Sequence, residues 1–405
     1  MAKWSTIFLI LFSLELLAQN EYITLKGEIV DNKTEELLPF ASIYLEGTSI
    51  GTTSNMEGAF EFHIPINMRN KKVIISMIGY TSVSIESSNF NSFQKVKLKE
   101  NVLTLSEIVV TDKQLTAKQI IKKAYESLSN NYPLEPYQLE GFIRDLQKED
   151  STYIELLECA AKFSYEKYDV KNEPSVELQA VRRNYISNKH PWNDDWERTN
   201  SIVDLVEDDF IRFNYGPIKV GKGWKYEIES VLPFNNRQVY KIVGVNKPYS
   251  QAILYIDVDS YAFVRIEYNR ASKKHSFYKR RLTNGQQEIA YNLTIAYQEY
   301  KGKWYLKYQK EEDVWAIFKN SESNKLLFTK YPKKELFINR IITQEESAFA
   351  DFKANLNITK SIESHSEQYN PDFWENYNAP LATKELSKIE QYLKQAQKIR
   401  DSDKK

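Results

Sequence analysis

Between residues 25 and 111, apolar side chains recur at every second position in several short runs. Ile43 and Leu45 flank a tyrosine, and Phe60 and Phe62 flank a glutamate, which is the period of a half-buried strand. Glycines stand between the runs, at Gly47, Gly51, Gly58 and Gly79. Because glycine accepts the backbone angles of tight turns, this alternation of short runs and turns predicts a small antiparallel β-sandwich.

The motifs within this stretch form a specific set. They are Gly27 with Ile29-Val30-Asp31, Leu38-Pro39-Phe40-Ala41, Gly47-Thr48, Gly51-Thr52-Thr53, Gly58 before Phe60, Ile78-Gly79-Tyr80 and Leu105-Ser106-Glu107-Ile108-Val109-Val110. On these motifs, residues 22–111 resemble the carboxypeptidase-regulatory-like domain, a transthyretin-like sandwich common on cell-envelope proteins of Bacteroidetes-type bacteria. The resemblance implies a non-catalytic accessory module. The chain departs from it at Asn55, where the family usually has an acidic residue, although asparagine also favours turns.

A connector helix is predicted at residues 112–132. Thr116 and Gln119 have the spacing of a capping box, and apolar residues then recur on one helical face. Pro133 ends the pattern, because proline disfavours helical angles in the residue before it. The motifs that follow resemble the largely uncharacterised downstream region of carboxypeptidase-like-regulatory-domain proteins. They are Asn131-Tyr132-Pro133, Gly141-Phe142-Ile143-Arg144 and Tyr153-Ile154-Glu155-Leu156-Leu157-Glu158.

From Trp224 to Tyr308, at least six runs each keep their apolar residues at one parity. Turn residues such as Lys301-Gly302 separate the runs, so we predict an antiparallel meander of strands. Within the last run Trp304, Leu306 and Tyr308 share one parity, and we expect these three side chains on one face of the sheet.

Residues 133–380 are therefore predicted to form a larger antiparallel domain, with a helix at 201–213. The segment 254–265 resembles the strand, turn and strand of lipoprotein-carrier-like folds, which suggests a curved sheet. Residues 381–405 are predicted as a carboxy-terminal helix with a polar tail. The predicted fold class is mainly β or α+β, with the sandwich first and the larger sheet after it.

The amino terminus has the layout of a secretory signal peptide at residues 1–18. Lys3 precedes an apolar run from Ile7 to Leu17, and Leu-Leu-Ala precedes Gln19. We expect an exported protein, in the periplasm or peripherally associated with the outer membrane, without a transmembrane span in the mature chain. Cys159 is the single cysteine, and its apolar neighbours favour a buried structural thiol over a nucleophile.

Charge and motif content exclude several classes of function. Lys+Arg and Asp+Glu both number 55, so no global field would recruit nucleic acid. The four histidines, at His63, His190, His275 and His365, lack the spacings of a catalytic zinc site. Because nucleotide and nucleophile-elbow motifs are also missing, we predict no enzyme activity, no metal and no cofactor.

Three charged segments could be binding sites, but each also has a structural explanation. Asp194-Asp195 beside Trp192 and Trp196 could bind a carbohydrate or a cation, but a solvated loop anchored by two aromatics is favoured. Glu207-Asp208-Asp209 is interpreted as the solvent face of a helix. The strongest basic cluster is formed by Lys273-Lys274-His275 with Lys279-Arg280-Arg281. It could bind phosphate groups or an acidic partner, but such charges more commonly protect an edge strand from pairing with another chain.

The favoured function is therefore binding or scaffolding in the cell envelope. A curved sheet could hold an apolar ligand or a glycan, and the sandwich could dock an envelope protein partner. The candidate ligand-lining residues are Trp224, Tyr226, Tyr268, Tyr291 and Trp304. The alternative is a glycan-directed or other hydrolase, whose carboxylates would converge in the second domain from different strands.

Overall fold

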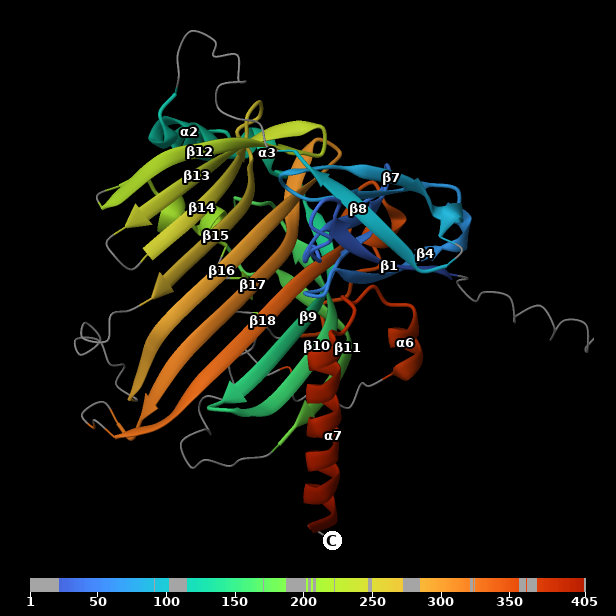
Figure 1. Cartoon of the computed structure of the whole chain (residues 1–405), viewed down its shortest axis with the longest axis vertical. Coiled ribbons are helices and arrows are strands. Elements are labelled where there is room, and N and C mark those ends of the chain that lie inside the picture. The colour runs from blue at the N-terminus through green and yellow to red at the C-terminus, as the bar shows by residue number, and fades with distance from the viewer. Residues whose placement is uncertain are drawn as a thin grey trace, which may run out of the picture.

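The computed structural model describes most of the chain. The described residues are 22–90, 92–101, 115–169, 171–186, 202, 205–206, 209–221, 223–246, 250–271, 285–320, 323, 325–356, 362 and 370–403. Within them the chain forms an amino-terminal sandwich and a ten-stranded sheet, called the large sheet below (Figure 1). The predicted fold class, mainly β with few helices, is confirmed.

The sandwich consists of two four-stranded sheets, with strand orders β4-β1-β8-β6 and β3-β2-β5-β7. All described pairings are antiparallel except the parallel pair β1 and β8. The strands are β1 (Tyr22–Asp31), β2 (Ser42–Leu45), β3 (Gly51–Thr53), β4 (Ala59–Pro65), β5 (Lys72–Ser76), β6 (Tyr80–Thr81), β7 (Val83–Glu86) and β8 (Gln94–Glu100).

The sandwich has a hydrophobic core of its own, which includes Ile29, Ile43 and Phe62 at 0% exposure. The structure shows why glycine is required at two positions of the sequence motifs. A Cβ atom at Gly27 would lie 2.3 Å from the carbonyl oxygen of Gln94, so only glycine lets β1 and β8 approach here. Gly79 has a φ of +87°, which confirms it as a turn position.

The connector forms two short helices, α2 (Ala117–Glu126) and α3 (Leu128–Asn131). The capping box is present, because the Thr116 side chain accepts from the Gln119 backbone N–H and the Gln119 side chain accepts from the Thr116 backbone N–H. One face of α2 is buried, through Ile120 and Ile121. The capping box and this apolar face fix where the connector helix begins and which side of it packs.

The large sheet has the order β11-β10-β9-β18-β17-β16-β15-β14-β13-β12 and is antiparallel throughout. The predicted meander from Trp224 onward is thereby confirmed, and the two-asparagine turn at Asn235 and Asn236 has positive φ at both residues. Its strands are β9 (Tyr137–Glu149), β10 (Thr152–Tyr165), β11 (Ser175–Tyr185), β12 (Trp224–Phe234), β13 (Arg237–Asn246), β14 (Ser250–Asp257), β15 (Phe263–Ala271), β16 (Gln286–Tyr300), β17 (Lys303–Phe318) and β18 (Leu326–Thr343).

A β-bulge in β17 changes which face its aromatic residues occupy. Opposite β16, Tyr297 pairs with Leu306 and Ala296 pairs with Tyr308, which leaves Lys307 as the extra residue. Leu306 packs with the helices, whereas Tyr308 lies on the opposite face in a separate cluster. The prediction that Trp304, Leu306 and Tyr308 share one face is therefore wrong for Tyr308, because the bulge inverts the alternation.

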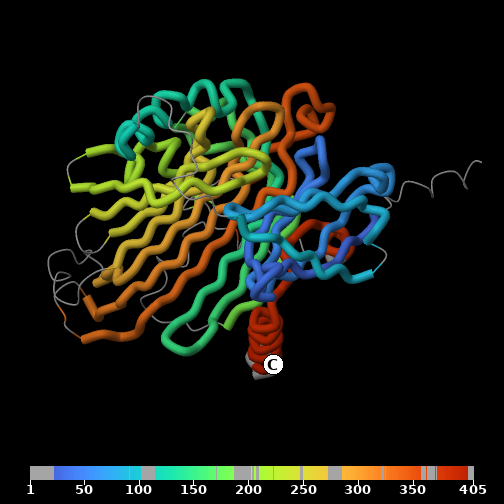
Figure 2. The backbone as a smooth tube through the Cα atoms, turned by 45° about the horizontal axis from the view of Figure 1, so that its top comes forward, coloured from blue at the N-terminus to red at the C-terminus, as the bar shows by residue number. Residues whose placement is uncertain are grey.

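The large sheet is covered on both faces. One face packs against α2, α3, α5 (Phe210–Phe213) and the 3-10 helix η5 (Gly216–Ile218) and forms the main core. The other face carries the sandwich, α6 (Pro371–Glu375) and α7 (Lys384–Asp403). In Figure 2 the α2 and α3 segment (teal) and the sandwich (blue) lie at separate places against the large sheet.

The sandwich is tied to the rest of the chain by several hydrogen bonds. The Ser49 hydroxyl donates to the carbonyl oxygen of Ile341 at 2.7 Å, and the Gly79 N–H donates to that of Pro233 at 2.9 Å. The backbone N–H of His63 donates to the side chain of Asn378 at 2.8 Å. These contacts tie the sandwich to β18, to β12 and to the segment between α6 and α7. None of the helices in the described ranges has the length and hydrophobicity that crossing a bilayer requires.

Candidate functional site

Four of the five predicted ligand-lining residues form one aromatic cluster. The rings of Trp224 and Tyr226 stack with centroids 5.6 Å apart, Tyr268 lies 6.4 Å from Trp224, and Tyr291 lies 6.0 Å from Tyr268. Phe210 of α5 meets Tyr268 edge to face at 5.3 Å. The cluster therefore packs beneath a helix, and the fifth residue, Trp304, lies elsewhere.

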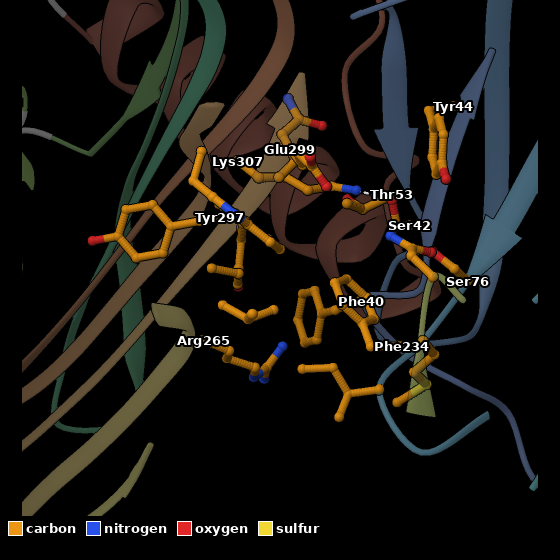
Figure 3. Close-up of a pocket in the computed structure, with 18 of the residues that line it drawn as sticks. Phe40, Ser42, Tyr44, Thr53, Ser76, Phe234, Arg265, Tyr297, Glu299 and Lys307 are labelled. Atoms are coloured by element: carbon orange, nitrogen blue, oxygen red, sulfur yellow. Dashed lines mark hydrogen bonds between the residues drawn. The ribbon is translucent and has the colours of Figure 1, made fainter. Parts of the chain in front are cut away.

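Trp304 lines a cavity of about 400 Å³ between the sandwich and the large sheet, called the interface cavity below. On the sandwich side its wall comes from β2, β3, the end of β5 and the loops beside them, and on the other side from strands β12 to β18. Figure 3 shows side chains from both sides pointing into it. None of the other four predicted residues lines this cavity.

One part of the interface cavity is apolar and aromatic. The Phe40 ring stacks on Tyr308 with centroids 5.1 Å apart, and the bulge in β17 places Tyr308 on this face of the sheet. Met77, Ile78 and Phe234 continue the apolar wall. Such surfaces favour the apolar part of a ligand by removing it from water.

Four charged side chains in the wall form two ion pairs. Arg237 of β13 meets Glu299 of β16 at 2.7 Å, and Arg265 meets Glu267 within β15 at 2.6 Å. Each carboxylate is thus bound to an arginine. The hydrolase alternative would use Glu267 and Glu299 as its converging carboxylates, and it would first have to release them from these ion pairs.

Lys307 is the remaining basic residue of the wall. The bulge directs its side chain toward the sandwich, where the amino group donates to the hydroxyl oxygen of Ser42. Burial lowers the pKa of Lys307 to about 7, because an ammonium ion loses its hydration there. At neutral pH this amine therefore exists in both the charged and the uncharged form.

Three more polar side chains in the wall hold atoms that lack partners within the described part of the chain. They are the hydroxyl oxygens of Thr53 and Ser76 and the amide nitrogen of Gln298. Thr53 and Ser76 are buried, at 5% and 1% exposure. A buried polar atom without a hydrogen bond costs free energy, so these groups are suited to a bound molecule or ordered water.

Comparison with known proteins identifies the sandwich. Residues 25–110 match the family model of the CarboxypepD_reg-like domain. The sandwich is a CarboxypepD_reg-like domain. No curated protein matches the chain.

Solved structures give only a distant likeness. A LolA superfamily protein from Nitrosomonas europaea is 11% identical over 60% of this chain and 100% of its own, with a TM-score of 0.23. A DUF1329 family protein from Desulfovibrio piger is 12% identical over 59% of this chain and 98% of its own, with a TM-score of 0.24. At these TM-scores the likeness carries no argument about function.

The acidic residue Asp209 corrects one interpretation from the sequence. It was expected on the solvent face of a helix, but it is buried and caps α5 by accepting from the Ile211 and Arg212 N–H groups. The hydroxyls of Tyr168 and Tyr297 each donate to it at 2.9 Å. Burial raises the pKa of Asp209. The void beside it measures only about 10 Å³, so we assign Asp209 a structural role.

Cys159 is buried, as its apolar neighbours indicate, and burial raises the pKa of its thiol. Within the described ranges no group of three or more His, Cys, Asp and Glu side chains could hold a metal ion. The remaining charged motifs cannot be placed. Asp194-Asp195 with its tryptophans, the basic residues 273–281, and His190 and His365 lie outside the described residues.

The residues of the interface cavity were missed from the sequence, except Trp304. Lys307 did carry a signal, because it interrupts the run Trp304-Tyr305-Leu306-Lys307-Tyr308. That pattern is compatible with an ordinary solvent-facing lysine, and only the contact with Ser42 of the CarboxypepD_reg-like domain shows otherwise. This site forms only where β17 and the sandwich, which are distant in the sequence, come into contact.

Proposed function

We propose that this protein is a non-enzymatic binding protein of the cell envelope, which holds a small ligand between its CarboxypepD_reg-like domain and the large sheet. The observation that carries the proposal is the interface cavity, where an apolar wall adjoins buried polar atoms of Thr53, Ser76 and Gln298 that lack partners among the described residues. A volume of about 400 Å³ suits a small organic molecule.

The lining supports binding rather than chemistry. Its two carboxylates are held by Arg237 and Arg265, and its aromatic residues are packed against one another. Orientation by a few polar groups within an apolar wall is the usual arrangement of a ligand site. The CarboxypepD_reg-like domain would then serve as one wall of the site as well as a docking module for an envelope partner.

Export to the envelope belongs to the same proposal, and the apolar run within residues 1–18 supports it. Intact-mass analysis of the protein recovered from the cell envelope tests this point. We expect a mature chain that begins near Gln19, and retention of Met1 in the exported protein would contradict the proposal.

Filling the cavity tests the binding function. Ser76→Leu places a bulky apolar group where a small buried hydroxyl now lines the wall, whereas Ser84→Leu alters an exposed residue on the adjacent strand β7. We expect Ser76→Leu to weaken binding of the neutral fluorescent probe N-phenyl-1-naphthylamine at least about tenfold, a change of about 1.4 kcal/mol, while Ser84→Leu binds as the wild type does.

Native mass spectrometry of the purified protein complements this comparison. A small molecule that co-purifies with the wild type and is lost in Ser76→Leu would support the interface cavity as its site. Equal probe binding by both variants, or no binding by the wild type, would contradict the proposed function.

A further inference from the structure

We infer that the ligand of the interface cavity is an amphiphile with a single acidic group, that this group binds the amine of Lys307, and that binding takes up a proton. This inference rests on the proposed binding function and names the ligand class. The reasons are the charge balance of the wall, the separation of its polar and apolar parts, and the partners of Lys307.

Charge balance indicates an anion. Arg237 and Arg265 are each matched by a carboxylate, Glu299 and Glu267, whereas the amino group of Lys307 bonds the neutral hydroxyl of Ser42. Protonated Lys307 is therefore the one basic group of the wall without a carboxylate partner among the described residues. A ligand with one negative charge would compensate the positive charge of Lys307, whereas the second charge of a dianion would have no cation to pair with in the wall.

Other ionisable groups face the cavity from each element around Lys307. Beside the two ion pairs, these groups are tyrosines: Tyr44 of β2, Tyr255 of β14, Tyr300 of β16 and Tyr308 of β17, together with Tyr297 of β16, whose hydroxyl donates to Asp209. Burial raises the pKa of Tyr44, Tyr255 and Tyr308, so these hydroxyls stay neutral near pH 7. Lys307 is thus the group of the wall that titrates near neutral pH.

The polar and apolar surfaces lie at different places in the cavity. Figure 3 shows Thr53 and Ser42 near the end of the Lys307 side chain, with Phe40 and Phe234 further along the wall. The unpartnered hydroxyls of Thr53 and Ser76 can donate to the oxygen atoms of an acid group. The aromatic wall would then cover the apolar part of the ligand.

Proton uptake follows from this placement. An anion beside Lys307 favours the ammonium form, so the uncharged fraction of the amine takes a proton from the buffer when the ligand binds. At pH 7 part of the amine is uncharged, and at pH 5.5 nearly all of it is charged. The number of protons taken up should therefore fall from a measurable fraction of one at pH 7 toward zero at pH 5.5.

Titration calorimetry with decanoate measures this number. The full-length wild type is titrated at pH 7 in phosphate and in Tris buffers, whose heats of ionisation differ strongly. We expect the binding heat at pH 7 to differ between the two buffers by the amount that corresponds to a fraction of a proton. At pH 5.5, measured in acetate and in MES, we expect this difference to be much smaller. 1-Decanol, which has no acidic group, should bind with equal heats in both buffers.

Variants of Lys307 test whether its amine is the group that takes up the proton when the ligand binds. Lys307→Met should weaken decanoate binding at least about tenfold, and Lys307→Arg should bind decanoate without proton uptake, because arginine is charged throughout. Lys225→Met, at an exposed position on β12, is the matched control. The wild-type buffer comparison needs no variant, so a variant that fails to fold does not decide the test.

The outcomes separate this inference from the proposed function. Equal binding heats in the two buffers at pH 7, or equal affinity of Lys307→Met for decanoate, would overturn the inference while leaving a binding site in the cavity. If neither decanoate nor the neutral probe binds the wild type, the proposed function falls as well.

Discussion

The side-chain amide of Asn55 donates a hydrogen bond to the backbone carbonyl oxygen of Leu381, at 3.1 Å, across 326 positions of the chain. The oxygen of the same side chain accepts from the backbone N–H groups of Glu57 and Ala59, each at 2.9 Å. An aspartate could hold the turn but could not donate to Leu381. The departure from the acidic residue of the family thus ties the CarboxypepD_reg-like domain to the segment that leads into α7.

Asn55→Asp is therefore expected to lower the free energy of unfolding of the whole protein by roughly 1–3 kcal/mol, because it places a carboxylate against a carbonyl oxygen. Urea denaturation measures the change. Asn89→Asp introduces the same charge at an exposed position and serves as control. If the two variants are equally stable, the hydrogen bond to Leu381 contributes nothing measurable.

Gly79→Val should destabilise the protein by about 1–3 kcal/mol, since a β-branched residue is strained at a φ of +87°. Open space surrounds the Cβ position, so the effect would come from backbone strain rather than from a clash. Gly221→Val is the matched control, because Gly221 does not have a positive φ and a Cβ atom there meets an ordinary contact at 3.6 Å. Thermal unfolding of both variants tests the assignment, and equal melting temperatures would argue against it.

Trp224→Ala and Trp304→Ala should each cost on the order of 3–5 kcal/mol, because both rings are buried, at 8% and 3% exposure. Their effects on binding should differ. Trp304 lines the interface cavity and Trp224 does not, so only Trp304→Ala should alter probe affinity. Denaturant unfolding and probe titration of both variants decide this, and a loss of probe binding in Trp224→Ala at full stability would place the ligand at the aromatic cluster instead.

Glu158 lies buried between two arginines, with Arg144 at 2.7 Å and Arg182 at 2.5 Å. Burial alone would raise the pKa of Glu158, but the two guanidinium groups outweigh it and hold the pKa below its ordinary value of 4.5. Glu158→Gln should therefore cost about 3–5 kcal/mol at pH 7, because it removes the only carboxylate that the described structure pairs with Arg182 and leaves Arg144 with the more distant Glu335, at 3.9 Å.

The same carboxylate makes this cost depend on pH. The stabilisation by Glu158 is complete above pH 4.5 and is lost as the pH falls through the lowered pKa, so the gap between wild type and Glu158→Gln should narrow in acid. Glu126→Gln, in an exposed pair with Lys122, should show a small effect at every pH. A gap that stays constant down to pH 3 would contradict this account.

Lys307 should make stability depend on pH in neutral to alkaline solution, where its buried amine destabilises the folded protein. Its pKa is about 7 in the folded protein and 10.5 ordinarily, so the unfolded chain binds more protons between these values and wild-type stability should rise with pH there. Lys307→Met removes the buried amine and should be more stable than wild type at pH 7, on the order of 2–4 kcal/mol, with the difference shrinking toward pH 10. Chemical denaturation across this range, with Lys225→Met as control, measures the trend, and a pH-independent difference would refute it.

The local features of this fold were readable from the sequence. The glycines and short alternating runs predicted the sandwich, and the turn residues predicted the meander, because both depend on neighbouring residues. Tyr308 and Asp209 were misplaced for a different reason. A single bulge at Lys307 moves Tyr308 to the other face, and two distant tyrosines enclose Asp209. The interface cavity depends on how the CarboxypepD_reg-like domain docks, which one-dimensional periodicity does not encode.

The place of β9 in the large sheet has a consequence for folding. β9 is the first strand of this sheet in the chain, yet it lies between β10 and β18, and β18 is the last strand to be synthesised. A pairing between such distant segments carries a large loop-closure entropy, and folds dominated by such pairings form slowly. Strands β9 to β11 can pair with one another early, but they must wait for nearly the whole chain before β18 joins them to the rest of the large sheet.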